Sequence, residues 1–105
     1  MRVSAALKSY VPYPLAEEQL EVVSQLRGLN LNDEFNGAIG KSRSFELTYA
    51  DCIKMVVLHP NVSEGGVSIS IGDRKALLAI ANGIYRKYDE PLIAEERPAV
   101  YPIND

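Results

Sequence analysis

The sequence predicts a small, mainly α-helical domain, and three observations carry this prediction. Apolar residues recur every three to four positions in two stretches of the 105-residue chain, and a third stretch is apolar on nearly all sides. Prolines and glycines punctuate these stretches where helices end. A composition of 47% apolar and 24% charged residues is typical of one globular domain with a modest core. We expect three main helices in a bundle, a short β-hairpin-like insert and an extended C-terminal arm.

The N-terminal third of the chain predicts two helices. A short one is expected from Ser4 to Val11, where Pro12 and Pro14 end it because proline lacks the amide N–H. The second is expected from Leu15 to Arg27, with Gly28 as the residue that terminates it. Its apolar face is predicted to consist of Leu20, Val22, Val23 and Leu26.

A segment rich in turn-forming residues follows, from Leu29 to Lys41. Its asparagines, aspartate and glycines predict a loop, with Phe35 and Ile39 reaching into the core. This loop is long for a compact domain, which favours a role as a contact surface or a moving element.

The strongest helical pattern runs from Ser44 to His59. Because its apolar residues lie on nearly all sides, we expect this helix to be central and buried. Ser42 or Ser44 is expected to cap its start, and Pro60 to end it.

Residues 61–70 read Asn-Val-Ser-Glu-Gly-Gly-Val-Ser-Ile-Ser and separate the two longest helical patterns. Val67, Ile69 and Ile71 alternate with small or polar residues, which indicates a strand with one apolar face after a glycine turn. A lone strand is only marginally stable, so we expect it to pair with Asn61-Val62, with another subunit, or with nothing regular. An extended loop lying on the helices is an equal alternative.

A final helix is predicted from Asp73, as its capping residue, to Tyr88. Beyond it, three prolines prevent regular structure, yet apolar residues persist. We therefore divide the chain into a helical domain, 1–90, and an extended arm, 91–105, part of which docks on its own domain or on a neighbour. The expected apolar stripe of the helix consists of Leu77, Ile80, Ala81, Ile84, Tyr85 and Tyr88.

Charge and cysteine content exclude several function classes. A net charge of −3 argues against nucleic-acid binding, which depends on neutralising phosphates. The single Cys52 allows no internal disulfide and no zinc site built from several thiolates, and its apolar neighbours predict a buried thiol. We predict no cofactor. Because no apolar run approaches ~20 residues and no signal peptide is evident, we expect a cytoplasmic protein without membrane contact.

No motif predicts an enzyme. His59 is the sole histidine and precedes a proline at the predicted end of a helix, so we expect it to cap the helix C-terminus. Cys52 lies seven positions before it, ~10 Å away along a helix axis, which is too far for an activated thiolate. The Glu64-Gly65-Gly66 turn lacks the lysine and preceding strand of a phosphate loop. Catalysis would require the loop from Leu29 to Lys41 and His59 to converge with Asp51 or Glu64 in space.

Several sequence pieces carry a resemblance to a known family: residues 61–70, Asp73-Arg74-Lys75, and residues 79–91, which read Ala-Ile-Ala-Asn-Gly-Ile-Tyr-Arg-Lys-Tyr-Asp-Glu-Pro. From about Ala5 to Pro91, the chain resembles a largely uncharacterised group of small phage and prophage proteins, some described as head–tail connector or head-completion proteins. Many helical connectors have a more evident helix pair before the long loop, whereas Pro12 and Pro14 interrupt that region here.

The resemblance implies a structural protein that forms a homo-oligomeric ring and contacts phage portal and tail-completion proteins. The resemblance also implies that the protein, after its synthesis in the cytoplasm, becomes associated with the virion. On this interpretation the insert and the arm contact neighbouring subunits. The contact residues are Ser63, Glu64, Gly65, Gly66, Val67, Ile69, Ile71, Leu92, Ile93 and Tyr101.

A different class of function stays open on the same residues. A small bacterial regulatory or ligand-binding module without catalytic activity would use the loop from Leu29 to Lys41 as a lid. That module would be a monomer with an enclosed pocket, so oligomeric state and ligand binding separate the two hypotheses.

Overall fold

The computed structural model describes residues 1–11, 15–58 and 71–93 and confirms the all-α class. These residues contain five helices and an isolated antiparallel bridge between Arg2 and Glu34. The predicted strand residues 67–70 and the rest of the insert lie outside the described ranges. The helices are α1 (Val3–Tyr10), α2 (Glu17–Leu26), α3 (Gly37–Gly40), α4 (Arg43–Leu58) and α5 (Ile71–Lys87).

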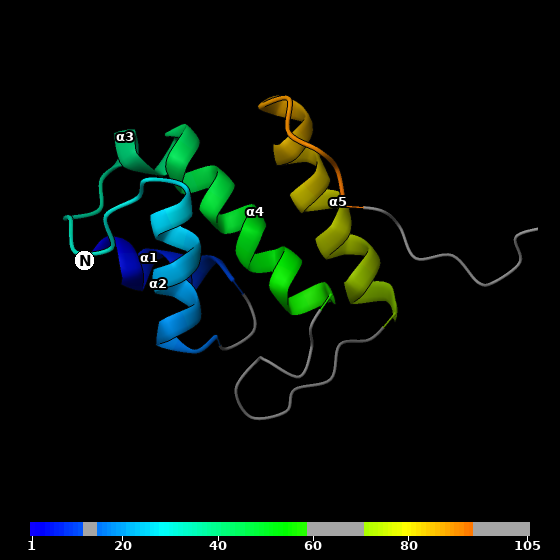
Figure 1. The fold of residues 1–105 in the computed structure, drawn as a ribbon, viewed down its shortest axis with the longest axis horizontal. Coiled ribbons are helices and arrows are strands. Elements are labelled where there is room, and N and C mark those ends of the chain that lie inside the picture. The colour runs from blue at the N-terminus through cyan, green and yellow to red at the C-terminus, as the bar shows by residue number, and fades with distance from the viewer. Residues whose placement is uncertain (12–14, 59–70, 94–105) are drawn as a thin grey trace, which may run out of the picture.

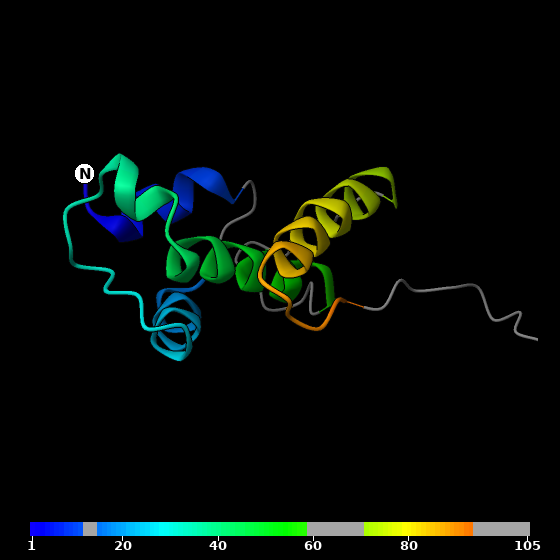
Figure 2. The same cartoon turned by 90° about the horizontal axis from the view of Figure 1, so that it is seen from above.

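Helix α4 lies at the centre of the domain, as its sequence predicts. Figures 1 and 2 show α1 and α2 on one side of it and α5 on the other. Its side chains join two separate apolar clusters, which we call the N-terminal core and the C-terminal core. The N-terminal core contains Val3, Ala6, Leu7, Val11, Leu15, Leu20, Val23, Phe45, Cys52 and Val56. The C-terminal core contains Leu47, Ala50, Ile53, Val57, Leu77, Leu78, Ala81, Tyr85 and Ile93.

The segment between α2 and α4 is attached to the N-terminus of the chain. Val3 N–H donates to the Asp33 carbonyl at 2.9 Å, and Phe35 N–H donates to the Met1 carbonyl at 2.8 Å. Phe35 and Ile39 pack against the N-terminal core, as predicted. The short helix α3 was not predicted, because its sequence, Gly-Ala-Ile-Gly, has low helix propensity.

Asn36 stabilises α3 by accepting a hydrogen bond from Ile39 N–H at 2.9 Å, as helix-capping residues do. At the other end of α3, a Cβ added to Gly40 would lie 2.9 Å from the ring of Phe35. A larger residue at position 40 would therefore force the Phe35 ring to shift.

Two helices end with the same hydrogen-bond pattern, the Schellman motif. At the end of α2, Gly28 has φ +73° and Leu29 N–H donates to the Ser24 carbonyl at 2.9 Å, as the glycine predicted. At the end of α5 the equivalent position is Asp89, with φ 58°, and Glu90 N–H donates to the Tyr85 carbonyl at 2.8 Å. An aspartate in this left-handed conformation is strained relative to glycine.

The predicted starts of the two long helices had different outcomes. Ser42 caps α4 by accepting a hydrogen bond from Phe45 N–H at 3.2 Å, which confirms one of the two predicted caps. Helix α5 begins at Ile71, so the prediction that Ile71 ends a strand is wrong. Asp73 lies inside the first helical turn and is not the capping residue.

The predicted apolar faces of α2 and α5 were partly wrong. In α2, Leu20 and Val23 are buried, but Val22 and Leu26 are 58% and 77% exposed. Helix α2 packs along one narrow stripe, and these two residues lie outside it. In α5, Ile80 is 43% exposed, whereas Leu78 is buried beside Ile93 in the C-terminal core. The buried stripe of α5 therefore includes Leu77, Leu78, Ala81 and Tyr85.

Candidate functional site

Three helix segments meet at a polar group of residues, which we call the arginine–aspartate cluster: Arg27, Asp51, Tyr85 and Glu90. Arg27 Nε donates to Asp51 Oδ2 at 2.7 Å, and Arg27 Nη2 donates to Asp51 Oδ1 at 3.1 Å. The Tyr85 hydroxyl donates to Asp51 Oδ1 at 2.5 Å. Glu90 pairs with Arg27 at 3.3 Å and with the more exposed Arg43 at 2.9 Å.

The electrostatics of this cluster favour a structural role. Hydrogen bonding to Asp51 raises the pKa of Arg27, so the guanidinium stays charged. Burial, and then the hydrogen bond to Asp51, raise the pKa of Tyr85 above its ordinary value. Both carboxylate oxygens of Asp51 accept hydrogen bonds from within the cluster. The cluster ties α2, α4 and the end of α5 together.

A second polar group joins α4 to the last turn of α5 at the surface. Glu46 accepts a hydrogen bond from the Tyr88 hydroxyl and pairs with Lys87 Nζ at 2.9 Å. The Tyr88 hydrogen bond, helped by Lys87, lowers the pKa of Glu46. This arrangement fixes the end of α5 on α4.

Asn82 holds the segment that follows α5. Its amide Nδ2 donates to the Ile93 carbonyl at 3.1 Å, and its Oδ1 accepts from Ile93 N–H at 2.7 Å. The side chain of Ile93 is 6% exposed and belongs to the C-terminal core. The predicted docking of part of the arm on its own domain is confirmed at this residue, and we call this arrangement the Asn82 clamp.

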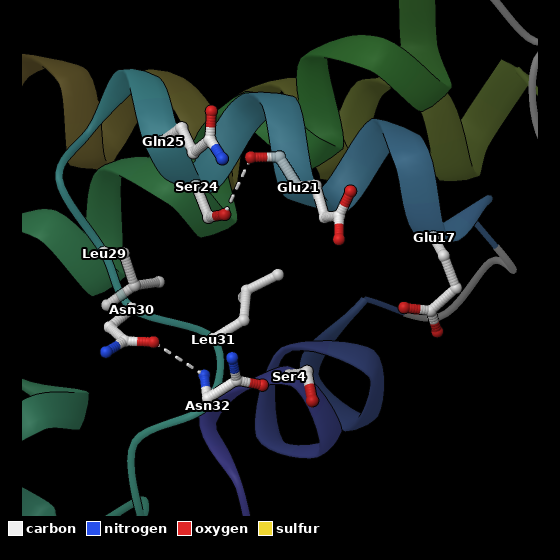
Figure 3. Close-up of a pocket in the computed structure, with 9 residues that line it drawn as sticks. All are labelled: Ser4, Glu17, Glu21, Ser24, Gln25, Leu29, Asn30, Leu31 and Asn32. Atoms are coloured by element: carbon white, nitrogen blue, oxygen red, sulfur yellow. Dashed lines mark hydrogen bonds between the residues drawn. The ribbon is translucent and has the colours of Figure 1, made fainter.

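An open pocket of about 360 Å³ lies between α1, α2 and the segment after α2. Figure 3 shows the Glu21 carboxylate and the Leu31 side chain directed into this space, with Ser4 on the opposite wall. Asn30 Oδ1 accepts a hydrogen bond from Asn32 N–H at 2.9 Å and so shapes one rim. Its lining is Ser4, Glu17, Glu21, Ser24, Gln25, Leu29, Asn30, Leu31 and Asn32.

The described residues offer neither a metal cluster nor a reactive thiol. Within residues 1–11, 15–58 and 71–93, no three histidine, cysteine or acidic side chains gather as metal ligands. Burial raises the pKa of the Cys52 thiol to about 12, as expected of a thiol in an apolar core. Over the same ranges, no helix combines the length and apolar character needed to cross a membrane.

Three of the ten predicted contact residues lie within the described ranges. Ile71 is the first residue of α5, Leu92 is 47% exposed, and Ile93 is buried under the Asn82 clamp. Of the residues considered for catalysis, Asp51 belongs to the arginine–aspartate cluster, while His59 lies outside the described ranges. The other predicted contacts also lie outside the described residues: Ser63, Glu64, Gly65, Gly66, Val67, Ile69 and Tyr101.

The arginine–aspartate cluster and the Asn82 clamp were not predicted. Arg27 and Asp51 are 24 positions apart, and Tyr85 is 34 positions from Asp51. The available signal was Asp51 inside the mostly apolar stretch of α4, since a carboxylate that is buried there needs a cationic or hydrogen-bonding partner. Asn82 gave a similar signal on the flank of the apolar stripe of α5.

A family model described as a family of unknown function, DUF6706, matches residues 1–105. The chain belongs to the DUF6706 family. No curated protein matches the sequence, and no solved structure matches it either. Because membership of DUF6706 brings no assigned activity, the contacts described above must carry the functional argument for this chain.

Proposed function

We propose that this member of DUF6706 is a structural interaction protein, a phage or prophage head–tail connector subunit. It assembles as a homo-oligomeric ring through protein–protein contacts with neighbouring copies and with portal and tail-completion proteins. The resemblance of residues 61–70 and 79–91 to connector and head-completion proteins supports the biological setting. The exposed apolar side chains of the domain support the role in assembly.

The observation that carries the proposal is a pair of large apolar residues on the outer face of α2. Val22 and Leu26 are 58% and 77% exposed, and one helical turn separates them, so they lie side by side. Exposed apolar side chains that adjoin one another are typical of a protein contact surface. A polar rim would complete such a surface, and Glu18 and Gln25 are exposed on the same helix.

The finer architecture is part of the same proposal. We describe the domain as a bundle of three main helices, α2, α4 and α5, with a hairpin-like insert between the last two. The end of α4 and the start of α5 lie at the same end of the domain (Figure 1). Contacts made there by the insert would be separate from those made by Val22 and Leu26, as a ring subunit with two neighbours requires.

Mass spectrometry of phage-like particles, purified after induction of the source strain, tests the connector proposal. We expect peptides of this chain at a few copies per particle, alongside portal protein. Their absence from particles in which portal and capsid proteins are well covered would contradict it. A Val22→Ser/Leu26→Ser variant should retain the fold, because neither side chain is buried, but should be depleted from such particles.

A ligand-binding module is the second candidate: the pocket beside α2 is open where this hypothesis expected an enclosed one, but it offers a concave, mainly polar surface to a ligand. Residues 29–32 of the predicted lid segment line this pocket, and the carboxylate of Glu21 would attract a cation, whereas Glu17 is already paired with Lys8. Titration with L-arginine and with spermidine, followed by NMR, tests this function. We expect chemical-shift changes at Asn30 and Asn32 that a Glu21→Gln variant abolishes; unchanged spectra with both probes would contradict it.

A further inference from the structure

Helix α5 holds the segment that follows it through the Asn82 side chain and through the C-terminal core. The two hydrogen bonds between the Asn82 amide and the backbone of Ile93 imitate the pairing of two strands. Both hydrogen bonds are made to backbone groups, so they do not depend on the side chain at position 93. The apolar side chain of Ile93 is buried in the C-terminal core, which α4 and α5 build, and this burial adds specificity.

A second anchor lies three residues earlier in the same segment. The Glu90 carboxylate contacts Arg27 at 3.3 Å and Arg43 at 2.9 Å, which places an acid between two guanidinium groups. The bound sequence is Glu90-Pro91-Leu92-Ile93, so the site recognises an acid followed three positions later by a β-branched apolar residue. Leu92, between the anchors, is 47% exposed and contributes little to recognition.

The connection between α5 and this segment is strained. Asp89 adopts φ 58°, a conformation that costs an L-residue energy, and it reverses the chain so that Ile93 returns to its own helix. Extending Asp89 to ordinary β geometry would remove this cost and direct Glu90 and Ile93 away from the helix. A strained hinge next to a detachable segment is the arrangement that favours exchange between copies.

We propose that the segment from Glu90 to Ile93 exchanges between subunits, and that the occupant of the Asn82 clamp in the assembled state is the segment of a second copy of this chain. This inference rests on the proposed function, because it supplies a contact for the assembly. In dilute solution the tether favours the chain's own segment, since it holds that segment at millimolar effective concentration. In a ring, the segment of the neighbouring subunit is held close to the clamp as well, so the chain's own segment no longer has the higher effective concentration.

Two variants of the full-length chain test the exchange by complementation. Ile93→Ser leaves the clamp intact but lacks the apolar anchor, so it can only accept a segment. Asn82→Asp keeps the segment but replaces the amide donor by a carboxylate facing the Ile93 carbonyl, so it can only donate one. Circular dichroism confirms that each variant is folded, and light scattering after size exclusion gives the mass of each alone and of an equimolar mixture.

We expect each variant alone to be a monomer and the mixture to contain a species of twice that mass. A mixture in which both variants stay monomeric at millimolar concentration would overturn the exchange. A capped peptide with the sequence of residues 89–95 checks the acceptor site directly: it should raise the Tm of Ile93→Ser, whereas the same peptide with serine for isoleucine should not. Failure of the first peptide to raise the Tm also overturns the proposal.

These outcomes are separable from the test of the proposed function. If the chain is found in particles but the two variants form no mixed species in solution, the connector role is supported and the exchange is overturned. If the two variants form a mixed species but the chain is absent from well-covered particles, the exchange is supported and the connector role is contradicted.

Discussion

Arg27 at the end of α2 and Asp51 in the middle of α4 form a two-pronged ion pair, with N–O distances of 2.7 and 3.1 Å. Arg27 also contacts Glu90 beyond α5, so one guanidinium connects helices that belong to both cores. A planar guanidinium suits this role because it offers several donors in fixed directions, which an ammonium group does not.

Substituting Arg27 by lysine should therefore destabilise the domain although the charge is kept. The two side chains of the pair are only 20% and 18% exposed, so we expect a loss of about 2 kcal/mol in the free energy of unfolding. Urea denaturation measures it. Lys8→Gln is the matched control, since Lys8 and Glu17 are 49% and 64% exposed and should contribute less than about 0.5 kcal/mol. Equal losses in the two variants would contradict a structural role for the cluster.

Replacing Asp89 by glycine should stabilise the protein by about 1 kcal/mol, because glycine adopts φ 58° without the strain of a side chain. Thermal unfolding gives the comparison. Gly28→Ala is the converse test: nothing lies within 4 Å of the added Cβ, so the expected loss of about 1 kcal/mol comes from φ +73° alone. An unchanged Tm for both variants would show that neither Schellman position is strained.

Glu46 should make part of the stability depend on pH. Its pKa in the folded state lies below the ordinary value of 4.5, chiefly because the Tyr88 hydroxyl donates to the carboxylate. A lowered folded pKa contributes stability that is present above pH 4.5 and lost as the pH falls through the folded value. We expect the difference in unfolding free energy between wild type and Glu46→Gln to shrink across that window. A difference that stays constant would contradict the assigned hydrogen bond.

The Cys52 thiol should react with a disulfide reagent only when the domain unfolds. It is buried and its pKa is about 12, so thiolate is scarce at neutral pH and the reagent cannot reach the sulfur. Absorbance after addition of an aromatic disulfide should rise at the unfolding rate in buffer and at once in denaturant. Immediate labelling of the folded protein would contradict burial.

Local patterns predicted the helices well, because periodicity, proline and glycine act within a few residues. Gly28 and Ser42 took the predicted roles at helix ends. The errors came from contacts between distant segments: Leu78 is buried in the C-terminal core, to which Ile93 also belongs, whereas the predicted core residue Ile80 is 43% exposed. The arginine–aspartate cluster could not be predicted either, because nothing local relates Asp51 to its two partners.

Helix α4 supplies side chains to both cores, and this has a consequence for how the domain opens. If α4 unwinds, Phe45 and Val56 leave one cluster while Ile53 and Val57 leave the other, so neither can persist alone. Amide hydrogens of α4 should therefore exchange with solvent only through global unfolding, whereas those near the outer ends of α1 and α5 escape through smaller openings. The two hydrophobic clusters thus unfold as one cooperative unit, because the same helix contributes side chains to both.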